Sequence, residues 1–125
     1  MEKKKVLVVD DSEIVLVMAR EALEEGGFEV QTCMSALGID KYVLGKDRPD
    51  VIILDVMLPV LDGDKKAKML KGNDLTRNIP IILLSSKPED ELRLLVKVSG
   101  SDGYFRKPFG KSQLVAKVQE VLDAI

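Results

Sequence analysis

Three aspartates follow two short apolar runs, and their type and position suggest a metal or phosphoryl site. Asp10 and Asp11 come directly after residues 6–9, and Asp55 comes directly after residues 51–54. Carboxylates held close together repel one another and resist ionisation unless a cation lies among them. Oxygen ligands without histidine or cysteine suit a hard divalent ion, of which Mg²⁺ is the leading candidate.

Two further polar groups follow the later apolar runs. Ser85 comes after residues 81–84, and Lys107 comes after residues 103–106. A metal ion and a lysine beside one carboxylate outline a phosphoryl-binding site, in which Asp55 would attack phosphorus and the cations would neutralise the phosphoryl oxygens. Each residue alone has an ordinary explanation as a turn, a helix cap or a surface charge. Their recurrence at four run ends favours a functional site.

Composition limits the classes of protein and of chemistry. The 125 residues fit one domain, since domains commonly hold about 100–150 residues. A net charge of −2 gives no basic excess for direct nucleic acid binding or for an anionic membrane. One cysteine excludes an internal disulfide, and the absence of histidine excludes Ser-His-Asp and Cys-His catalysis. No apolar run reaches the roughly 18 residues of a membrane span, so we expect a cytoplasmic protein without membrane insertion.

The elements that must position the polar groups alternate along the chain. Short, β-branched apolar runs suit strands that are covered on both faces, as in a parallel sheet. We expect strands at residues 6–9, 28–32, 51–54, 81–84 and 103–106. Helical patterns predict helices at residues 12–25, 35–46, 64–71, 88–98 and 111–124. Gly38 weakens the second helix by about 1 kcal/mol relative to alanine.

Five alternating units of strand and helix predict an α/β fold. The natural arrangement at this length is a doubly wound five-stranded parallel sheet of order 2-1-3-4-5, with five helices on both faces. Ligands bind such sheets outside the carboxyl ends of the strands, where the strand order reverses. We therefore expect one rim of the sheet to gather Asp10, Asp11, Asp55, Ser85 and Lys107.

Four segments carry a specific pattern. They are VVDDS at 8–12, DVIILDVMLP at 50–59 with Asp62-Gly63, PIILLS at 80–85 and YFRKPF at 104–109. In order and spacing they resemble the receiver domain of bacterial two-component response regulators. The resemblance covers essentially the whole chain and implies a single receiver domain over residues 1–125, with the flavodoxin-like fold of chemotaxis regulators.

The resemblance implies a role for each residue of the rim. Asp55 corresponds to the phosphoacceptor, and Ser85 and Lys107 correspond to the groups that contact the phosphoryl oxygens. The implied Mg²⁺ ligands are the carboxylates of Asp10, Asp11 and Asp55 and the backbone carbonyl of Met57.

The resemblance also implies a switch. Ser85 would turn to the phosphoryl group, and Tyr104 would turn inward on activation. This movement would change the partner-binding face made by the fourth helix, the fifth strand and the fifth helix. The bond from Lys107 to Pro108 is usually cis in the family.

The implied function is that of a phosphorylatable signalling switch. Asp55 would accept a phosphoryl group from a sensor histidine kinase or a histidine phosphotransfer protein, acting in trans because this chain has no histidine. Autodephosphorylation would reset the state, so the chain would be an enzyme only toward itself. It would act on an output protein, and phosphorylation could also pair two copies.

Two alternatives stay open. One is a receiver-like adaptor that binds partners without being phosphorylated. The other is a phosphatase with an aspartyl-phosphate intermediate, although such enzymes place the nucleophile after the first strand and usually carry a cap domain.

The first helix carries an unusual apolar run at residues 14–18, which is apolar on all sides. A helix that lies on a sheet needs only one apolar stripe. Part of the run, with Leu16 in it, should therefore be either an exposed docking patch for the kinase or a surface covered by the fifth helix. We expect Cys33, Met34 and Met69 to fill gaps in the core.

Overall fold

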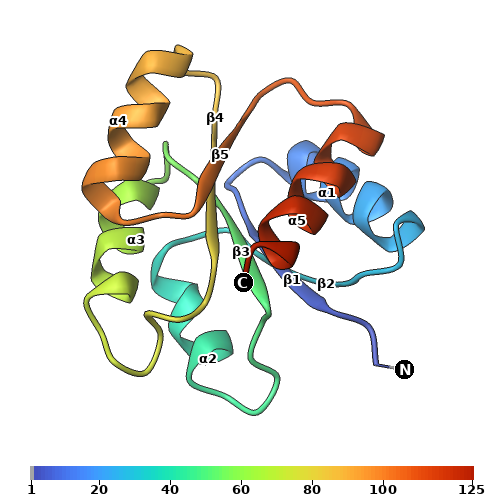
Figure 1. Cartoon of the computed structure of the whole chain (residues 1–125), viewed down its shortest axis with the longest axis horizontal. Helices are drawn as coiled ribbons and strands as arrows, with labels where there is room; N and C mark the ends of the chain where they lie inside the picture. Colours follow the sequence, from blue (N-terminus) through green and yellow to red (C-terminus); the bar gives the residue numbers. More distant parts are fainter. Residues whose placement is uncertain (1) are drawn as a thin grey trace.

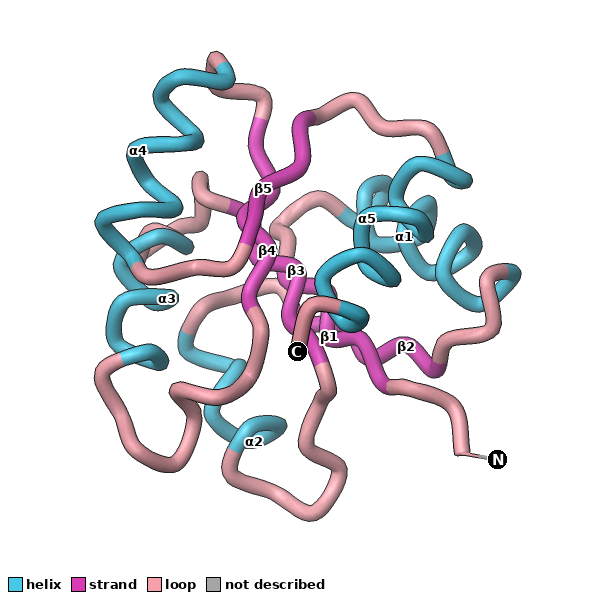
Figure 2. The backbone as a smooth tube through the Cα atoms, in the orientation of Figure 1, coloured by secondary structure: helices cyan, strands magenta, loops and turns pink. Residues whose placement is uncertain are grey.

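The computed structural model describes residues 2–125 and contains one parallel sheet. Its strands are β1 (Lys5–Val9), β2 (Glu29–Cys33), β3 (Val51–Asp55), β4 (Ile81–Ser85) and β5 (Gly103–Arg106). They pair in the order β2-β1-β3-β4-β5, as predicted (Figure 2). The apolar runs of β1, β3 and β4 are buried along nearly their whole length, because helices cover both faces of the sheet.

The helices form two layers, one on each face of the sheet (Figure 1). They are α1 (Glu13–Glu25), α2 (Asp40–Val43), α3 (Gly63–Lys71), α4 (Glu89–Ser99) and α5 (Lys111–Asp123), with a 3-10 turn, η1 (Leu37–Ile39), before α2. Helices α1 and α5 cover one core, and α2, α3 and α4 cover the other. Among the described residues, none of the helices has the length and apolar character needed to cross a membrane.

The predicted helix at residues 35–46 is wrong in extent. The structure has only the 3-10 turn and the single turn of α2 there. A Cβ atom at Gly38 would press on the sulfur of Cys33, so this segment lies directly against the end of β2. Tyr42 then donates a hydrogen bond from its hydroxyl to the carbonyl of Thr32 at 3.2 Å, which holds α2 to the sheet edge.

The apolar run in α1 divides between core and surface. Leu16 belongs to the covered part of the run, not to an exposed patch: its side chain is buried, and Val15 packs partly against the same core beside α5. Ile14 and Val17 are instead exposed, by 72% and 55%. The rotation of α1 about its own axis decides which of these apolar side chains face the sheet. At the start of this helix, Ser12 Oγ accepts a hydrogen bond from the Val15 amide.

Of the three residues that were expected to fill gaps in the core, only one packs there. Met34 and Met69 are exposed, so their prediction as core residues is wrong, whereas Cys33 is half-buried and packs against the core under α2 and α3.

A buried lysine joins the short α2 to α3. The side chain of Lys66 is only 5% exposed, and its Nζ lies 2.7 Å from Oδ1 of Asp40. A buried ammonium is costly unless a carboxylate pairs with it. Asp40 therefore stabilises the position of α2 through a residue of the neighbouring helix.

We expect Asp40→Ala to lower the free energy of unfolding by about 1–2 kcal/mol, because the buried Lys66 ammonium would lose the carboxylate that pairs with it. The control is Asp74→Ala, which removes an exposed pair with Arg77 and should cost less than about 0.5 kcal/mol. Urea unfolding of both variants measures the difference. Equal losses in the two variants would contradict a stabilising role for the pair of Lys66 with Asp40.

Candidate phosphoryl and metal site

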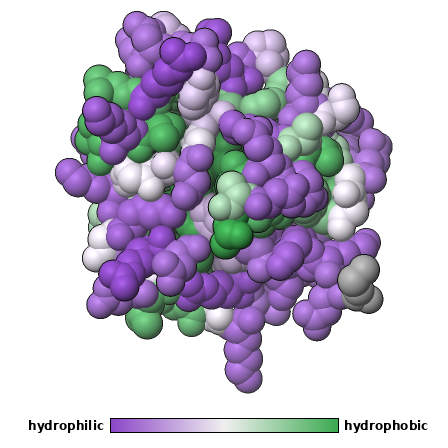
Figure 3. Space-filling view, viewed as in Figure 1, coloured by the Kyte–Doolittle hydropathy of each residue, from purple (hydrophilic) through white to green (hydrophobic). Residues whose placement is uncertain are grey.

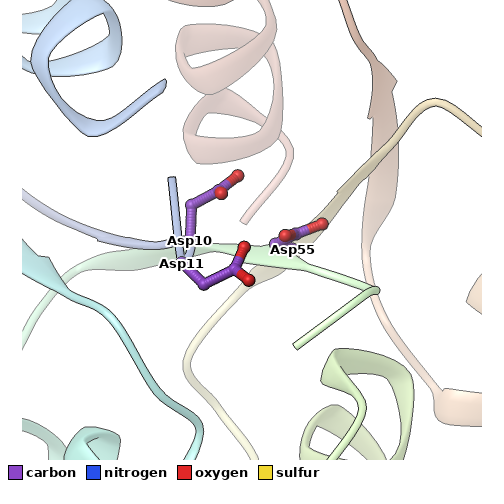
Figure 4. Close-up of side chains that lie close together, drawn as sticks. All are labelled: Asp10, Asp11 and Asp55. Atoms are coloured by element: carbon purple, nitrogen blue, oxygen red, sulfur yellow. The ribbon is translucent and has the colours of Figure 1, made fainter. Parts of the chain in front are cut away.

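Three carboxylates meet at the carboxyl edge of the sheet (Figure 4). Val9 of β1 pairs with Leu54 of β3, so Asp10 and Asp55 follow as neighbours on adjacent strands. One oxygen atom from each of Asp10, Asp11 and Asp55 lies within 4.8 Å of the others. Asp10 and Asp55 are buried, whereas Asp11 is exposed and extends toward Asp55.

Lys107 supplies a positive charge to this cluster. Its Nζ lies 2.7 Å from Asp10 Oδ2 and 3.5 Å from Asp55 Oδ1. The Lys107 amide donates a hydrogen bond to the Ser85 carbonyl at 2.9 Å, and a cis bond to Pro108 follows, as the resemblance implied. Burial opposes the charged form, but the contacts with Asp10 and Asp55 outweigh it and raise the pKa of Lys107.

The surroundings of Asp55 disfavour its ionised form. Burial, together with the negative charge of Asp10, raises the pKa of its carboxyl to about 6. The Lys107 ammonium and a 3.2 Å hydrogen bond donated by the Met57 amide oppose this rise without cancelling it. One ammonium is therefore insufficient to balance the carboxylates.

The two residues of the expected switch lie at different depths. Ser85 is buried at the end of β4, next to β3, and its Oγ accepts a hydrogen bond from the Lys87 amide at 3.0 Å. Tyr104 of β5 is half-buried, and its hydroxyl donates a hydrogen bond to Glu89 in the first turn of α4. This bond, with the neighbouring Arg93, lowers the pKa of Glu89.

The residues at this edge fit a hard divalent cation. All the candidate donors are oxygens, which Mg²⁺ prefers. Lys107 Nζ is not aligned for a hydrogen bond with Asp10 Oδ2, so this buried oxygen has unused acceptor capacity. The Met57 carbonyl accepts no hydrogen bond from another described backbone group and lies in the loop directly after Asp55. A second cation would offset the excess negative charge.

One structural requirement of the site was missed by sequence reasoning. The pair Asp62-Gly63 is part of the family pattern and is by itself an ordinary turn signal, so no contact with the site was predicted for it, yet Gly63 packs directly on the backbone of Asp55. A Cβ at this position would clash with the Asp55 carbonyl oxygen, and the Gly63 amide donates a 2.8 Å hydrogen bond to Val56. A glycine directly before the predicted helix at residues 64–71 does not by itself specify a close contact.

The chain matches a known family and many of its members. Residues 6–119 match the family described as the response regulator receiver domain. The phosphate regulon transcriptional regulatory protein PhoB of Pseudomonas aeruginosa is 38% identical over 124 residues, covering 98% of this chain and 53% of that protein. The alkaline phosphatase synthesis transcriptional regulatory protein PhoP of Bacillus subtilis is 37% identical over 119 residues, covering 95% and 48%. The chain thus spans about half the length of these curated relatives.

Solved structures agree with the sequence match. The chemotaxis response regulator CheY4 of Vibrio cholerae superposes with a TM-score of 0.88 at 32% identity, covering 96% of this chain and 99% of that one. A putative response regulator from Chloroflexus aurantiacus gives a TM-score of 0.91 at 30% identity, covering 98% and 99%. The chain therefore belongs to the response regulator receiver domain family, the signalling switches of two-component systems.

Proposed function

We propose that this protein is a switch controlled by reversible phosphorylation of Asp55. The proposal rests on one observation: Asp55 is buried beside two further carboxylates and within 3.5 Å of the Lys107 ammonium. This arrangement suits a carboxylate that attacks phosphorus while positive charge gathers around the phosphoryl oxygens.

The phosphoryl donor would be a phosphohistidine on a sensor histidine kinase or a histidine phosphotransfer protein. An Asp55 carboxylate oxygen forms the new P–O bond, the P–N bond breaks, and the imidazole nitrogen keeps the electron pair. Hydrolysis later breaks the same P–O bond, releases inorganic phosphate and restores the carboxylate. The chain would act as an enzyme only on itself.

The residues around Asp55 would divide the work. Asp10, Asp11, Asp55 and the Met57 carbonyl would hold Mg²⁺, which when bound would offset the negative charge on the phosphoryl oxygens. Lys107 would pair with one phosphoryl oxygen, and the Ser85 hydroxyl would donate a hydrogen bond to another. Ser85 lies one residue beyond Leu84, the β4 partner of Asp55, and its Oγ would turn from the Lys87 amide toward the phosphoryl group.

The proposed output is a change in the face made by α4, β5 and α5. Movement of Ser85 would open space for the Tyr104 ring, which would then lose its hydrogen bond to Glu89. A cytoplasmic output protein, or a second copy of the chain, would read this change. The receiver domain over residues 1–125 would bind no nucleic acid itself.

Phosphorylation tests the proposal directly. Acetyl phosphate with Mg²⁺ should increase the intact mass by one phosphoryl group, because Asp55 is the nucleophile. The increase should be absent in Asp55→Asn and present in Asp62→Asn, which removes a nearby carboxylate outside the cluster. An unchanged mass would favour the adaptor, and multiple turnover of an external phosphomonoester would favour the phosphatase.

The stability of the metal-free protein should depend on pH through Asp55. Its raised pKa means that its neutral form stabilises the apo fold below the unfolded pKa of 3.8, and this contribution is lost as the pH rises through about 6. With chelator at about pH 7.5, Asp55→Asn should therefore be more stable than wild type, by on the order of 3 kcal/mol at most, and the gain should vanish near about pH 4.

Mg²⁺ should stabilise the wild-type protein by mass action at about pH 7.5 and less at about pH 5, where protons compete for Asp55. Denaturant unfolding with and without Mg²⁺ measures both effects. Asp11→Asn is the control, because it removes an exposed ligand and should abolish the Mg²⁺ effect without a large gain in the apo protein. A Mg²⁺ effect that survives in both variants would place the metal elsewhere.

The switch predicts that Tyr104→Ala separates phosphorylation from its structural output. Asp55 should still be phosphorylated, but beryllofluoride should shift the amide resonances of α4 and α5 much less than in wild type. Tyr104→Phe keeps the ring and loses the hydrogen bond to Glu89, so it should retain the shifts. Full shifts in Tyr104→Ala would rule out the ring as the coupling element.

A further inference from the structure

A groove between α3 and α4 lies beside the aspartate edge. Its volume is about 300 Å³. Six of the residues that line it matter for its chemistry: Met57, Asp62, Asp64, Glu91, Leu94 and Leu95. A space of this size holds one large side chain and is too small for a folded domain.

The apolar part of the groove is not needed by the core. Helix α4 already buries Leu92 completely against the sheet, and Leu95 packs beside it. Leu94 nevertheless stays 61% exposed, and Val98, one turn later on the same stripe, is 58% exposed. Hydrophobic side chains gather on this part of the surface, at the upper left of Figure 3. The stripe is typical of a contact surface rather than of a solvated helix face.

The rim of the groove carries unpaired negative charge. Asp62 occupies the cap position of α3, yet its carboxylate makes no capping hydrogen bond. Among residues 2–125, neither Asp62 nor Asp64 has a cation within ion-pair distance, although both are partly buried. Glu91 has only Lys87, at 3.7 Å. Three carboxylates thus face one ammonium, which leaves the groove short of positive charge.

We propose that this groove is a docking site for a protein partner's segment that carries one large apolar side chain flanked by lysine or arginine. The apolar side chain would enter between Leu94 and Leu95, and the basic residues would pair with Asp62 and Asp64. The match of shape and opposite charge is what gives a small interface its specificity. This docking does not require phosphorylation of Asp55.

The probe is a short synthetic peptide with one tryptophan flanked on both sides by lysines in a Gly/Ser background. The chain contains no tryptophan, so any change in tryptophan emission belongs to the peptide. Titration of the full ¹⁵N-labelled chain should shift amides at the start of α3 and along α4. Control peptides with glutamate for lysine, or serine for tryptophan, should bind at least about tenfold more weakly.

Matched variants locate the site. Leu94→Ser should weaken binding, whereas Leu44→Ser should not, although both leucines are 61% exposed. Asp62→Asn with Asp64→Asn should also weaken it, whereas Asp74→Asn with Asp90→Asn removes the same charge elsewhere and should not. Leu94→Ser should still be phosphorylated by acetyl phosphate, which separates this proposal from that for Asp55.

Three results would overturn the proposal. They are no binding up to about 1 mM peptide, equal binding of the lysine and glutamate peptides, and shifts that map outside α3 and α4. Concentration-dependent dimerisation that Leu94→Ser abolishes and Leu44→Ser preserves would instead assign the groove to a second copy of the chain.

Discussion

The site depends on an imbalance of charge around Lys107. Two buried carboxylates, Asp10 and Asp55, share a single ammonium, and Asp11 adds a third negative group at the surface. Burial of carboxylates without enough positive charge destabilises the fold at this edge of the sheet. The destabilisation is visible in the raised pKa of Asp55. Because the site lacks positive charge, a cation that binds there lowers the free energy of the folded protein. This stabilisation links the stability of the fold to its function.

The parallel sheet makes such a concentration of charge possible. Backbone hydrogen bonds beyond the strand ends fix the positions of the key residues: the Asp10 amide donates to Cys33, the Val56 amide to Leu84 and the Lys107 amide to Ser85. The reacting groups therefore sit on the rigid part of the molecule. The adjoining loops, the start of α4 and the edge strand β5, which holds Tyr104, carry the half-buried and exposed groups that can change partners.

The sequence was most informative where local chemistry decides the structure. Apolar, β-branched runs predicted the strands and their order, and polar residues directly after the runs predicted the edge where they meet. Features that depend on how elements pack were not visible. The close approach of Gly38 to Cys33 beside the short α2 depends on tertiary packing, and the burial of Leu16 reflects the rotation of α1 within an all-apolar run. The groove beside Leu94 requires the spacing of two helices, which no local pattern encodes.

The contact of Gly63 with the backbone of Asp55 has a mechanical consequence. With no side chain between them, and with the Gly63 amide bonded to Val56, the first turn of α3 and the last residue of β3 must move as one body. The start of helix α4 is held differently, by side chains of β5: the Tyr104 hydroxyl donates a hydrogen bond to Glu89, and Arg106 Nε donates one to the Lys87 carbonyl at 3.0 Å. Movement of the Tyr104 side chain would therefore release one tie of α4 while the contact of α3 with β3 stayed in place. The distance between α3 and α4 would then change.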